Sequence, residues 1–150
     1  MNVDDIQPTL QSILIGIGLF SAVQSRILTD DGAQDSPMED GLLKEGLSIL
    51  LMQPQSIKVF DHTRGSVTIE YTAPILVRTN PRILKEDGTA PKWDPLACEK
   101  AIIPAVLQWS KARLGNFGFF VPPGDGPETV WMDQGNNTRM ITFGIRIVYS

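Results

Sequence analysis

The residues that could do chemistry are few, and they stand far apart in the sequence. His62, the one histidine, follows Asp61, and a carboxylate beside an imidazole can act as an acid–base pair. We expect both residues in a solvent-exposed turn over residues 61–65, where adjacent side chains rarely aim at a common point. No nucleophile motif accompanies the pair, so we do not expect catalysis there.

Cys98 is the one cysteine, so the chain cannot form an internal disulfide. Nothing in the sequence marks a basic pocket that would activate its thiol, and we expect a small, buried or half-buried apolar residue. One cysteine and one histidine are also too few for a zinc site of the Cys/His type.

Residues 28–46 form an acidic segment that could be imagined to hold a calcium ion. Its carboxylates are Asp30, Asp31, Asp35, Glu39 and Asp40. A calcium loop places carboxylates at alternate positions and closes with a glutamate, and this spacing does not match. We expect a solvated, mobile loop, with a partner surface or a pore lining as the alternative.

Residues 122–127 are rich in glycine and proline, but no lysine follows and no helix opens there, so the phosphate-binding loop pattern is absent. A pocket for a small ligand is the remaining possibility. Its members would be Trp93, Trp109, Trp131 and Tyr71, with Asp61 or His62 nearby. Aromatic side chains fit a core or a subunit interface equally well. We therefore predict no catalytic, cofactor-binding or metal-binding residues.

Length and composition are those of an ordinary globular chain. With 150 residues, 42% of them apolar and 20% charged, the chain is large enough for one domain over residues 1–150 with its own core. The net charge of −4 and the pI of about 4.9 do not favour gripping a nucleic-acid backbone, which needs a basic face. An acidic wall that DNA passes without binding is compatible with these values.

Residues 6–25 carry no charge, which raises the question of a membrane span or a signal peptide. Polar residues interrupt this stretch, and its apolar part, residues 13–23, is too short to cross about 30 Å of hydrocarbon. Asp4 and Asp5 precede it where a signal peptide carries positive charge. We expect a buried helix and no membrane association.

The first helix is predicted over residues 1–27, with Pro8 in its first turn and burial on more than one side. Gly16 and Gly18 each lower the helix propensity, by about 1 kcal/mol relative to alanine. We interpret these glycines as sites of close packing, and a flexible joint is the alternative.

A second helix is predicted to begin after Asp94, a good N-cap, with Pro95 at its first position, and to run to about Leu114. Gly115 would end this helix, and Pro104 in its middle should kink it. The core stripe is expected to be Leu96, Ile103, Val106, Leu107 and Leu114.

Alternating apolar and polar residues predict two long strands. In Ser66–Thr79 one face holds Val67, Ile69, Tyr71, Ala73, Ile75 and Val77. In residues 139–149 one face holds Ile141, Phe143, Ile145, Ile147 and Tyr149. Pro74 cannot donate to a ladder, so we expect an edge position, a bulge or a bend there. One apolar face per strand indicates an antiparallel sheet that is covered on one side.

Shorter strands are predicted at residues 47–53, 57–61, 116–121 and 129–133, with a hairpin over residues 57–78 that turns at Gly65. Residues 80–93 should form a long loop. The order of helix, strands, loop, helix and strands predicts an α+β fold: a mainly antiparallel sheet with two helices packed on one face, and long loops.

In element order and size the chain resembles the tail terminator and head–tail joining (tail completion) proteins of long-tailed bacteriophages. The segments that carry the resemblance are the N-terminal helix, the acidic segment, residues 47–54, residues 68–78, the helix that starts at Asp94, and residues 139–149. Together they cover nearly the whole chain. The resemblance lies in architecture, since these proteins share order and size rather than signature residues.

The resemblance implies a non-enzymatic virion protein that forms a ring, typically of six subunits, in the tail or neck after assembly in the host cytoplasm. Its partners would be further copies of itself, the tail tube protein and the head connector or neck protein. DNA would pass through without specific binding, and residues 30–40 would face the lumen or a neighbouring ring. Two alternatives stay open: another tail or secretion-apparatus subunit, and a small-ligand-binding domain.

Overall fold

The computed structural model describes residues 1–31, 35–114, 118–123, 131–133 and 135–150. Within them the helices are α1 (Ile6–Ile15), α2 (Asp35–Lys44) and α3 (Pro95–Arg113), and short 3-10 helices cover Val3–Asp5, Gly18–Phe20 and Gln24–Arg26. The strands are β1 (Ile27–Thr29), β2 (Leu47–Leu51), β3 (Gln55–Thr63), β4 (Ser66–Thr79), β5 (Trp131–Asp133) and β6 (Asn136–Tyr149). They form a six-stranded sheet of order β1-β2-β4-β6-β5, with β3 paired to β4 outside this path. The predicted α+β class is confirmed.

Strand β4 is the centre of the sheet, because it pairs with β6 from Val67 opposite Tyr149 to Thr79 opposite Asn137. The alternation predicted for both strands is confirmed. Their buried apolar side chains are Ala73, Ile75, Val77, Ile141, Phe143, Ile145 and Ile147. Burying a large apolar side chain contributes about 1.5–3 kcal/mol, so this long pair supplies a major part of the core energy.

Pro74 lies within this central strand, not at an edge or a bulge of its ladder with β6. Met52 donates its N–H to the Pro74 carbonyl at 3.0 Å, and Pro74 has no N–H to return. On the same side of β4, β2 ends at Leu51 and β3 begins at Gln55. The missing donor therefore points at the gap where β4 exchanges one partner strand for the next, which is why a central strand tolerates proline here.

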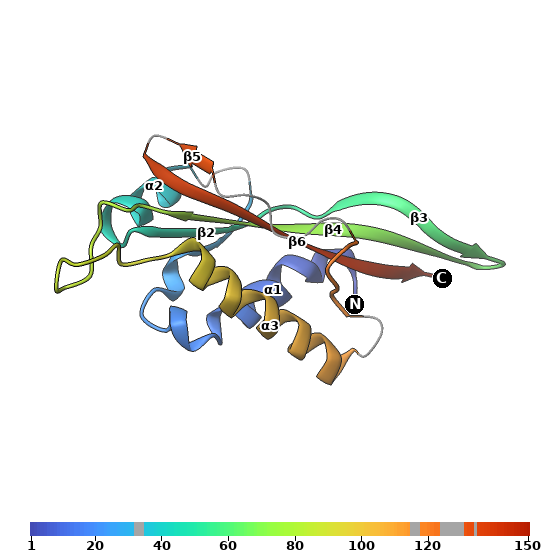
Figure 1. Ribbon diagram of the computed structural model, residues 1–150. Coiled ribbons are helices and arrows are strands. Elements are labelled where there is room, and N and C mark those ends of the chain that lie inside the picture. Colours follow the sequence, from blue (N-terminus) through green and yellow to red (C-terminus); the bar gives the residue numbers. More distant parts are fainter. Residues whose placement is uncertain (32–34, 115–117, 124–130, 134) are drawn as a thin grey trace.

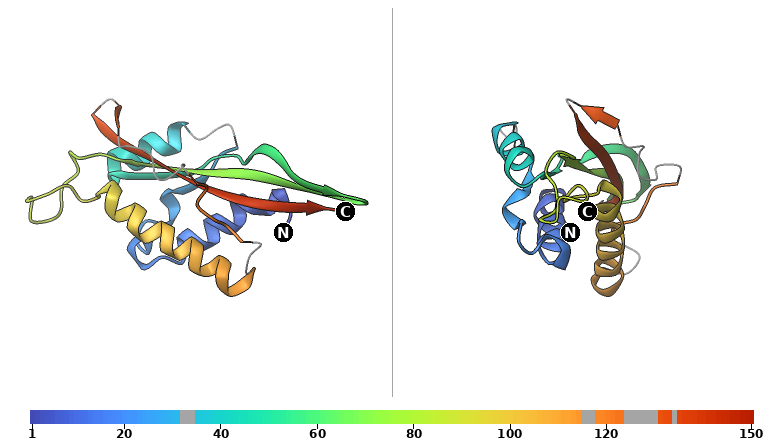
Figure 2. Two further views of the ribbon diagram at one scale, coloured as in Figure 1. Left: turned by 45° about the vertical axis from the view of Figure 1, so that its right-hand side comes forward. Right: turned by 60° about the vertical axis from the view of Figure 1, so that its left-hand side comes forward.

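Helices α1 and α3 lie side by side on one face of the sheet, as predicted (Figure 1). They contribute to the same core cluster as the strands, with Ile6, Leu10 and Leu14 from α1 and Cys98, Ile102 and Val106 from α3. Helix α2 lies on the opposite side of β2, where a Cβ on Gly41 would stand 3.7 Å from Ser48 (Figures 1 and 2). The prediction of two helices on one face of the sheet is therefore confirmed for α1 and α3, whereas α2 is a third helix that was not predicted.

The first helix is much shorter than residues 1–27, because α1 ends at Ile15 with Gly16 as its C-cap. The chain then turns into β1, an unpredicted strand that runs parallel to β2. Close packing does not account for the glycines: a Cβ on Gly16 would meet only backbone oxygens, the nearest at 3.4 Å, and one on Gly18 would meet nothing within 4 Å. The low helix propensity of Gly16 fits its place at the end of α1, and Gly18 begins the next 3-10 helix. Pro8 lies in the first turn, as predicted.

The acidic segment is not a loop throughout, since α2 occupies Asp35–Lys44. Met38 and Leu42, four residues apart, are buried and give this otherwise polar helix an apolar side. Lys44 forms an ion pair with Asp40 one turn earlier, at 2.9 Å. Residues 32–34 lie outside the described residues.

Helix α3 begins as predicted: Asp94 Oδ1 accepts a hydrogen bond from the Leu96 N–H at 3.0 Å, and Pro95 takes the first position. Pro104 stays inside the helix. The predicted core stripe is confirmed in part: Val106 is buried, and Ile103 and Leu107 are half-buried and pack against the core, but Leu96 is not a core residue. The buried residues after the first turn are Cys98, Ile102, Val106 and Ser110, at a spacing of four, and Leu96 is exposed. Gly115 lies outside the described residues.

The predicted strand over residues 116–121 reduces, in the described part, to one bridge between Phe120 and Gly144. Phe120 N donates to Gly144 O at 2.9 Å, and Gly144 N donates to Phe120 O at 2.7 Å. A Cβ on Gly144 would lie 2.6 Å from the Phe120 ring, so the approach requires glycine. Of the predicted strand 129–133, β5 is described and residues 129–130 are not.

The molecule is elongated, with a projection at each end (Figures 1 and 2). At one end β3 and β4 form the predicted hairpin, and we call β3, residues 66–72 of β4 and residues 144–149 of β6 the arm. The hairpin turns at residues 64–65, where Gly65 has a φ of +88°. At the other end residues 80–93 form the predicted loop, with one bridge between Leu84 and Pro91.

Candidate functional site

Asp61 and His62 do not form an acid–base couple. Both lie in β3 rather than in a turn, and both are exposed. Asp61 stands opposite Thr68 and His62 opposite Val67, so their side chains leave opposite faces of the arm. The expectation of a turn is wrong, and the expected solvent exposure of both residues is confirmed.

Glu39 and Asp40 of α2 are engaged in ion pairs. Asp40 accepts from Lys44 at 2.9 Å and from Arg26 at 3.0 Å, and these hydrogen bonds lower its pKa below the usual value. Glu39 lies 3.6 Å from Arg78. Among the residues whose positions are described, no group of three or more His, Cys, Asp or Glu could hold a metal ion.

Three of the aromatic residues proposed for a ligand pocket, Trp93, Trp109 and Tyr71, do not converge. Trp93 packs against Phe20 with ring centroids 6.0 Å apart, whereas Trp109 lies under the guanidinium of Arg113 at 5.3 Å. Trp93 precedes α3, and Trp109 lies 14 residues after Pro95, about 21 Å further along the helix. The hydroxyl of Tyr71 bonds to that of Tyr149 at 2.7 Å, which raises the pKa of Tyr149 to about 12. The side chain of Trp131 lies outside what is described.

Cys98 is fully buried in the core, as predicted. Burial, and then the negative charge of Asp94, raise its pKa to about 12. A thiol in this state is a packing residue and not a nucleophile. The glycine- and proline-rich segment 122–127 cannot be compared with its expectation, because residues 124–127 lie outside the described residues.

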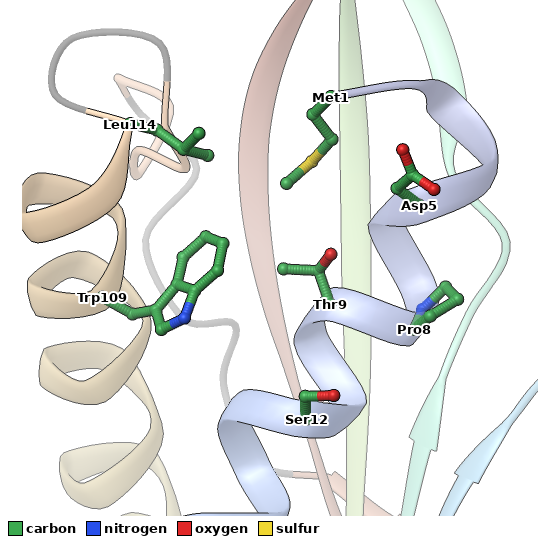
Figure 3. Close-up of a pocket in the computed structure, with 7 residues that line it drawn as sticks. All are labelled: Met1, Asp5, Pro8, Thr9, Ser12, Trp109 and Leu114. Atoms are coloured by element: carbon green, nitrogen blue, oxygen red, sulfur yellow. The ribbon is translucent and has the colours of Figure 1, made fainter.

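An open groove of about 420 Å³ runs between α1 and α3 (Figure 3). Its lining residues are Met1, Asp5, Pro8, Thr9, Ser12, Trp109 and Leu114. Asp5 is the only titratable side chain among them, and it accepts a hydrogen bond from the Asn2 N–H at 2.9 Å. The groove therefore has no acid–base pair or nucleophile and base to support a reaction.

A larger groove of about 770 Å³ lies at the start of α3, beside residues 80–93. We call it the Trp93 groove, and its walls include Trp93, Pro91, Pro95, Leu19 and Lys85. The walls are mainly apolar. Leu19 is 45% exposed at the groove, and Leu84, bridged to Pro91, is 48% exposed.

The arm carries a charged cluster on its face opposite α1 and α3. Glu70, with a side chain 7% exposed, lies 3.1 Å from Arg146 Nε and 3.7 Å from Lys58 Nζ. The Arg146 guanidinium also stands over the rings of Phe60 and Phe120, at 3.7 and 5.0 Å. Such stacking and pairing hold the arm together rather than offering a reactive group. The sequence shows a glutamate and an arginine, Glu70 and Arg146, on the polar faces of the two long strands, so a pair of opposite charges could have been predicted. It does not show the register of the two strands, so the partners could not have been identified.

Strand β3 presents large apolar side chains to solvent. Ile57, Val59 and Phe60 are 46–59% exposed, and β3 has only β4 as a strand partner in the described part of the chain. Sequence reasoning missed these residues, because an apolar strand is normally taken as core. Solvent-facing apolar surface of this kind usually marks contact with another molecule. The candidate functional sites are therefore surfaces: the arm and the Trp93 groove.

No helix within the described residues is long and apolar enough to cross a membrane. No family model matches the chain, and no curated protein matches its sequence.

Proposed function

We propose that this chain is a non-enzymatic assembly protein of long-tailed phage virions. Copies of it close into a ring, typically of six subunits, that ends the growing tail tube and joins it to the head connector. The ring sits in the tail or neck of the virion, and DNA passes through it without specific binding.

The arm is the observation that carries this proposal. It projects from the helix-covered core and exposes Ile57, Val59 and Phe60, which a protein working alone would place inside. The grooves and clusters described above contain no constellation that would support catalysis. In the described part of the chain, surfaces without a reactive site favour assembly over an enzyme. The separation of Trp93, Trp109 and Tyr71 disfavours the small-ligand alternative.

The charge of the chain is compatible with a DNA conduit. With a net charge of −4, the chain as a whole does not attract a phosphate backbone, because affinity for DNA comes from basic residues that displace its counterions. The hypothesis that residues 30–40 line the lumen needs one revision, because Glu39 and Asp40 are paired with Arg78, Arg26 and Lys44. A wall of paired charges would be closer to neutral than the sequence suggests.

Electron microscopy with isolated tail tubes tests the proposal. The purified chain should form closed rings with a central hole, and these rings should sit at one end of each tube. A matched control is bovine serum albumin at the same concentration, which should leave the ends bare. Failure to bind tube ends under any condition would contradict the proposal.

A second candidate is another tail, baseplate or secretion-apparatus subunit. The observation that favours it is the position of exposed apolar surface at both ends of an elongated molecule, because head-to-tail contacts that do not close give filaments. In the same images, open filaments or decoration along the whole tube would select this alternative.

A further inference from the structure

We propose that α2 is a detachable cover of the sheet: it opens from β2 as a unit while the rest of the fold stays intact, and the salt concentration controls this opening. The opening needs no partner and no second copy. It can therefore be refuted without any effect on the proposed function.

The apolar attachment of α2 is small. Its buried apolar side chains are Met38 and Leu42, which are 6% and 1% exposed. Neither belongs to the core cluster that α1, α3 and the strands share, because α2 lies on the opposite side of the sheet (Figure 2). A helix whose apolar contacts stand apart from the main core can open without disrupting that core. Release of α1 or α3 would instead take side chains out of the cluster and amount to global unfolding.

Ion pairs provide much of the remaining attachment of α2. They join its carboxylates, and that of Glu45 behind it, to the rest of the chain: Arg26 to Asp40 at 3.0 Å, Arg26 to Glu45 at 3.7 Å, Arg78 to Glu39 at 3.6 Å and Lys92 to Glu45 at 3.9 Å. The side chains of these carboxylates are 33–51% exposed. Dissolved salt therefore screens the attraction, since the Debye length falls from about 10 Å at 0.1 M to about 3 Å at 1 M.

The surface under α2 contains a polar group that closure leaves without a partner. A Cβ on Gly41 would lie 2.7 Å from the Leu47 carbonyl oxygen and 3.7 Å from the Cβ of Ser48, so α2 approaches β2 closely at this point. Ser48 is fully buried, and its Oγ has no hydrogen-bond partner among the described residues. Burial of an unpaired hydroxyl costs free energy, and water can reach it when the helix opens. The closed state therefore carries a cost that the open state relieves.

The chain after α2 provides a pivot. Gly46 follows the helix with a φ of +78°, and its carbonyl accepts a hydrogen bond from the Asn80 N–H at 2.9 Å. The Asn80 side chain also donates from Nδ2 to the Leu42 carbonyl at 3.1 Å, which ties the last turn of α2 to the end of β4. Opening therefore begins in the first half of the helix, around Met38 and Asp40.

Hydrogen exchange followed by mass spectrometry measures the opening in the full chain. Peptides over residues 38–46 report on α2, and peptides within α3 are the internal reference. After correction for intrinsic rates, we expect α2 of the wild type to exchange at least about tenfold faster than α3. Raising sodium chloride from about 0.05 M to about 1 M should speed the exchange of α2 at least about threefold more than that of α3.

Two substitutions at the same carboxylate separate the attachment of α2 from its stability as a helix. Arg26→Gln removes the partner of Asp40 outside α2, whereas Lys44→Gln removes the partner of Asp40 within α2. We expect Arg26→Gln to speed the exchange of α2 at least about fivefold, and Lys44→Gln at most about twofold. Glu45→Gln loses the pairs with Arg26 and Lys92, and it replaces Arg26→Gln if that variant does not fold.

A second pair of substitutions tests the covered surface. Ser48→Ala removes the unpaired hydroxyl under α2, and we expect the exchange of α2 to slow at least about threefold. Thr79→Val is the matched control. The Thr79 hydroxyl is also buried and has no partner among the described residues, but it shares its face of β4 with Val77, on the side of α1 and α3. This variant should leave the exchange of α2 within about twofold of the wild type.

Exchange of α2 as slow as that of α3, or exchange that salt does not change, would overturn the inference. Equal effects of Arg26→Gln and Lys44→Gln would also overturn it, because α2 would then respond to its own helical stability and not to its attachment. Faster exchange in Ser48→Ala would show that the hydroxyl stabilises the closed state, which contradicts the cost assigned to closure. The images of tube ends test the proposed function separately from all of these results.

Discussion

Arg146 of β6 donates a hydrogen bond from Nε to Oε1 of Glu70 on β4 at 3.1 Å, and the two residues stand directly opposite each other in the ladder. The Glu70 side chain is 7% exposed and that of Arg146 is 41% exposed. Removing one partner of a buried pair leaves a charge without compensation, which costs more than the pair contributes. The bridge therefore ties the two long strands of the arm together on the face opposite α1 and α3.

Arg146→Gln should lower the free energy of unfolding by about 1–3 kcal/mol, less than for a fully buried pair, because Lys58 remains 3.7 Å from Glu70. Urea denaturation measures the loss. Glu70→Gln in the same chain should recover part of it, with a coupling energy of at least about 0.5 kcal/mol. Arg64→Gln in the exposed hairpin turn is the control and should change stability by less than about 0.5 kcal/mol. Equal effects of Arg64→Gln and Arg146→Gln would contradict a structural role for the bridge.

Leu76→Pro should destabilise the fold far more than replacing the natural proline two residues earlier. Leu76 stands opposite Leu50 inside the β2–β4 ladder, so a proline there removes a bond between two central strands and costs about 2–4 kcal/mol. Pro74→Thr should change stability by less than about 1 kcal/mol, because position 74 faces the gap between β2 and β3. Thermal unfolding of the two variants compares them. A large loss in Pro74→Thr would show that the gap itself depends on proline.

The long strands could be predicted because their signal is local. Every second residue is apolar from Val67 to Val77 in β4 and from Ile141 to Tyr149 in β6, and a strand with one buried face is the element that gives this pattern. The start of α3 could also be predicted, since Asp94 and Pro95 mark the beginning of a helix within two residues. The buried face of α3 could not be predicted from hydrophobicity alone, because the core contains Cys98, Ile102 and Val106 while the more apolar Leu96 is exposed.

The remaining elements depend on contacts between distant parts of the chain. Strand β1 has three residues and exists through parallel pairing with β2, which a single sequence does not reveal. Helix α2 looks like a loop because only Met38 and Leu42 give it an apolar side. The candidate surfaces were missed for a related reason: Val59 reads as core, and only the fold shows that β3 projects beyond the helices.

Cys98 should resist alkylation in the folded protein. Its pKa is raised from 9.0 to about 12, so at pH 8 the thiolate fraction falls roughly a thousandfold, and burial excludes the reagent as well. Because the folded pKa lies above the unfolded one, the associated stability is complete below pH 9 and is lost as the pH rises toward 12. Mass spectrometry after iodoacetamide treatment should show no label at pH 8 and one label in guanidinium. Ser12→Cys, with an exposed thiol, should add one fast label while Cys98 stays protected.

Gly46→Ala should be more destabilising than Gly65→Ala, although both glycines have positive φ angles, +78° and +88°. Each alanine pays about 1–2 kcal/mol for the left-handed backbone. A Cβ on Gly46 would also stand 2.8 Å from the Cβ of Ile83, whereas one on Gly65 would meet nothing within 4 Å. We therefore expect losses of about 2–4 kcal/mol for Gly46→Ala and about 1 kcal/mol for Gly65→Ala, measured by urea denaturation. Both variants carry the same cost for a left-handed backbone, so the difference between their losses measures the steric contact of the new Cβ with Ile83. Equal losses would mean that the loop over residues 80–93 moves away from the end of α2 at no cost in stability.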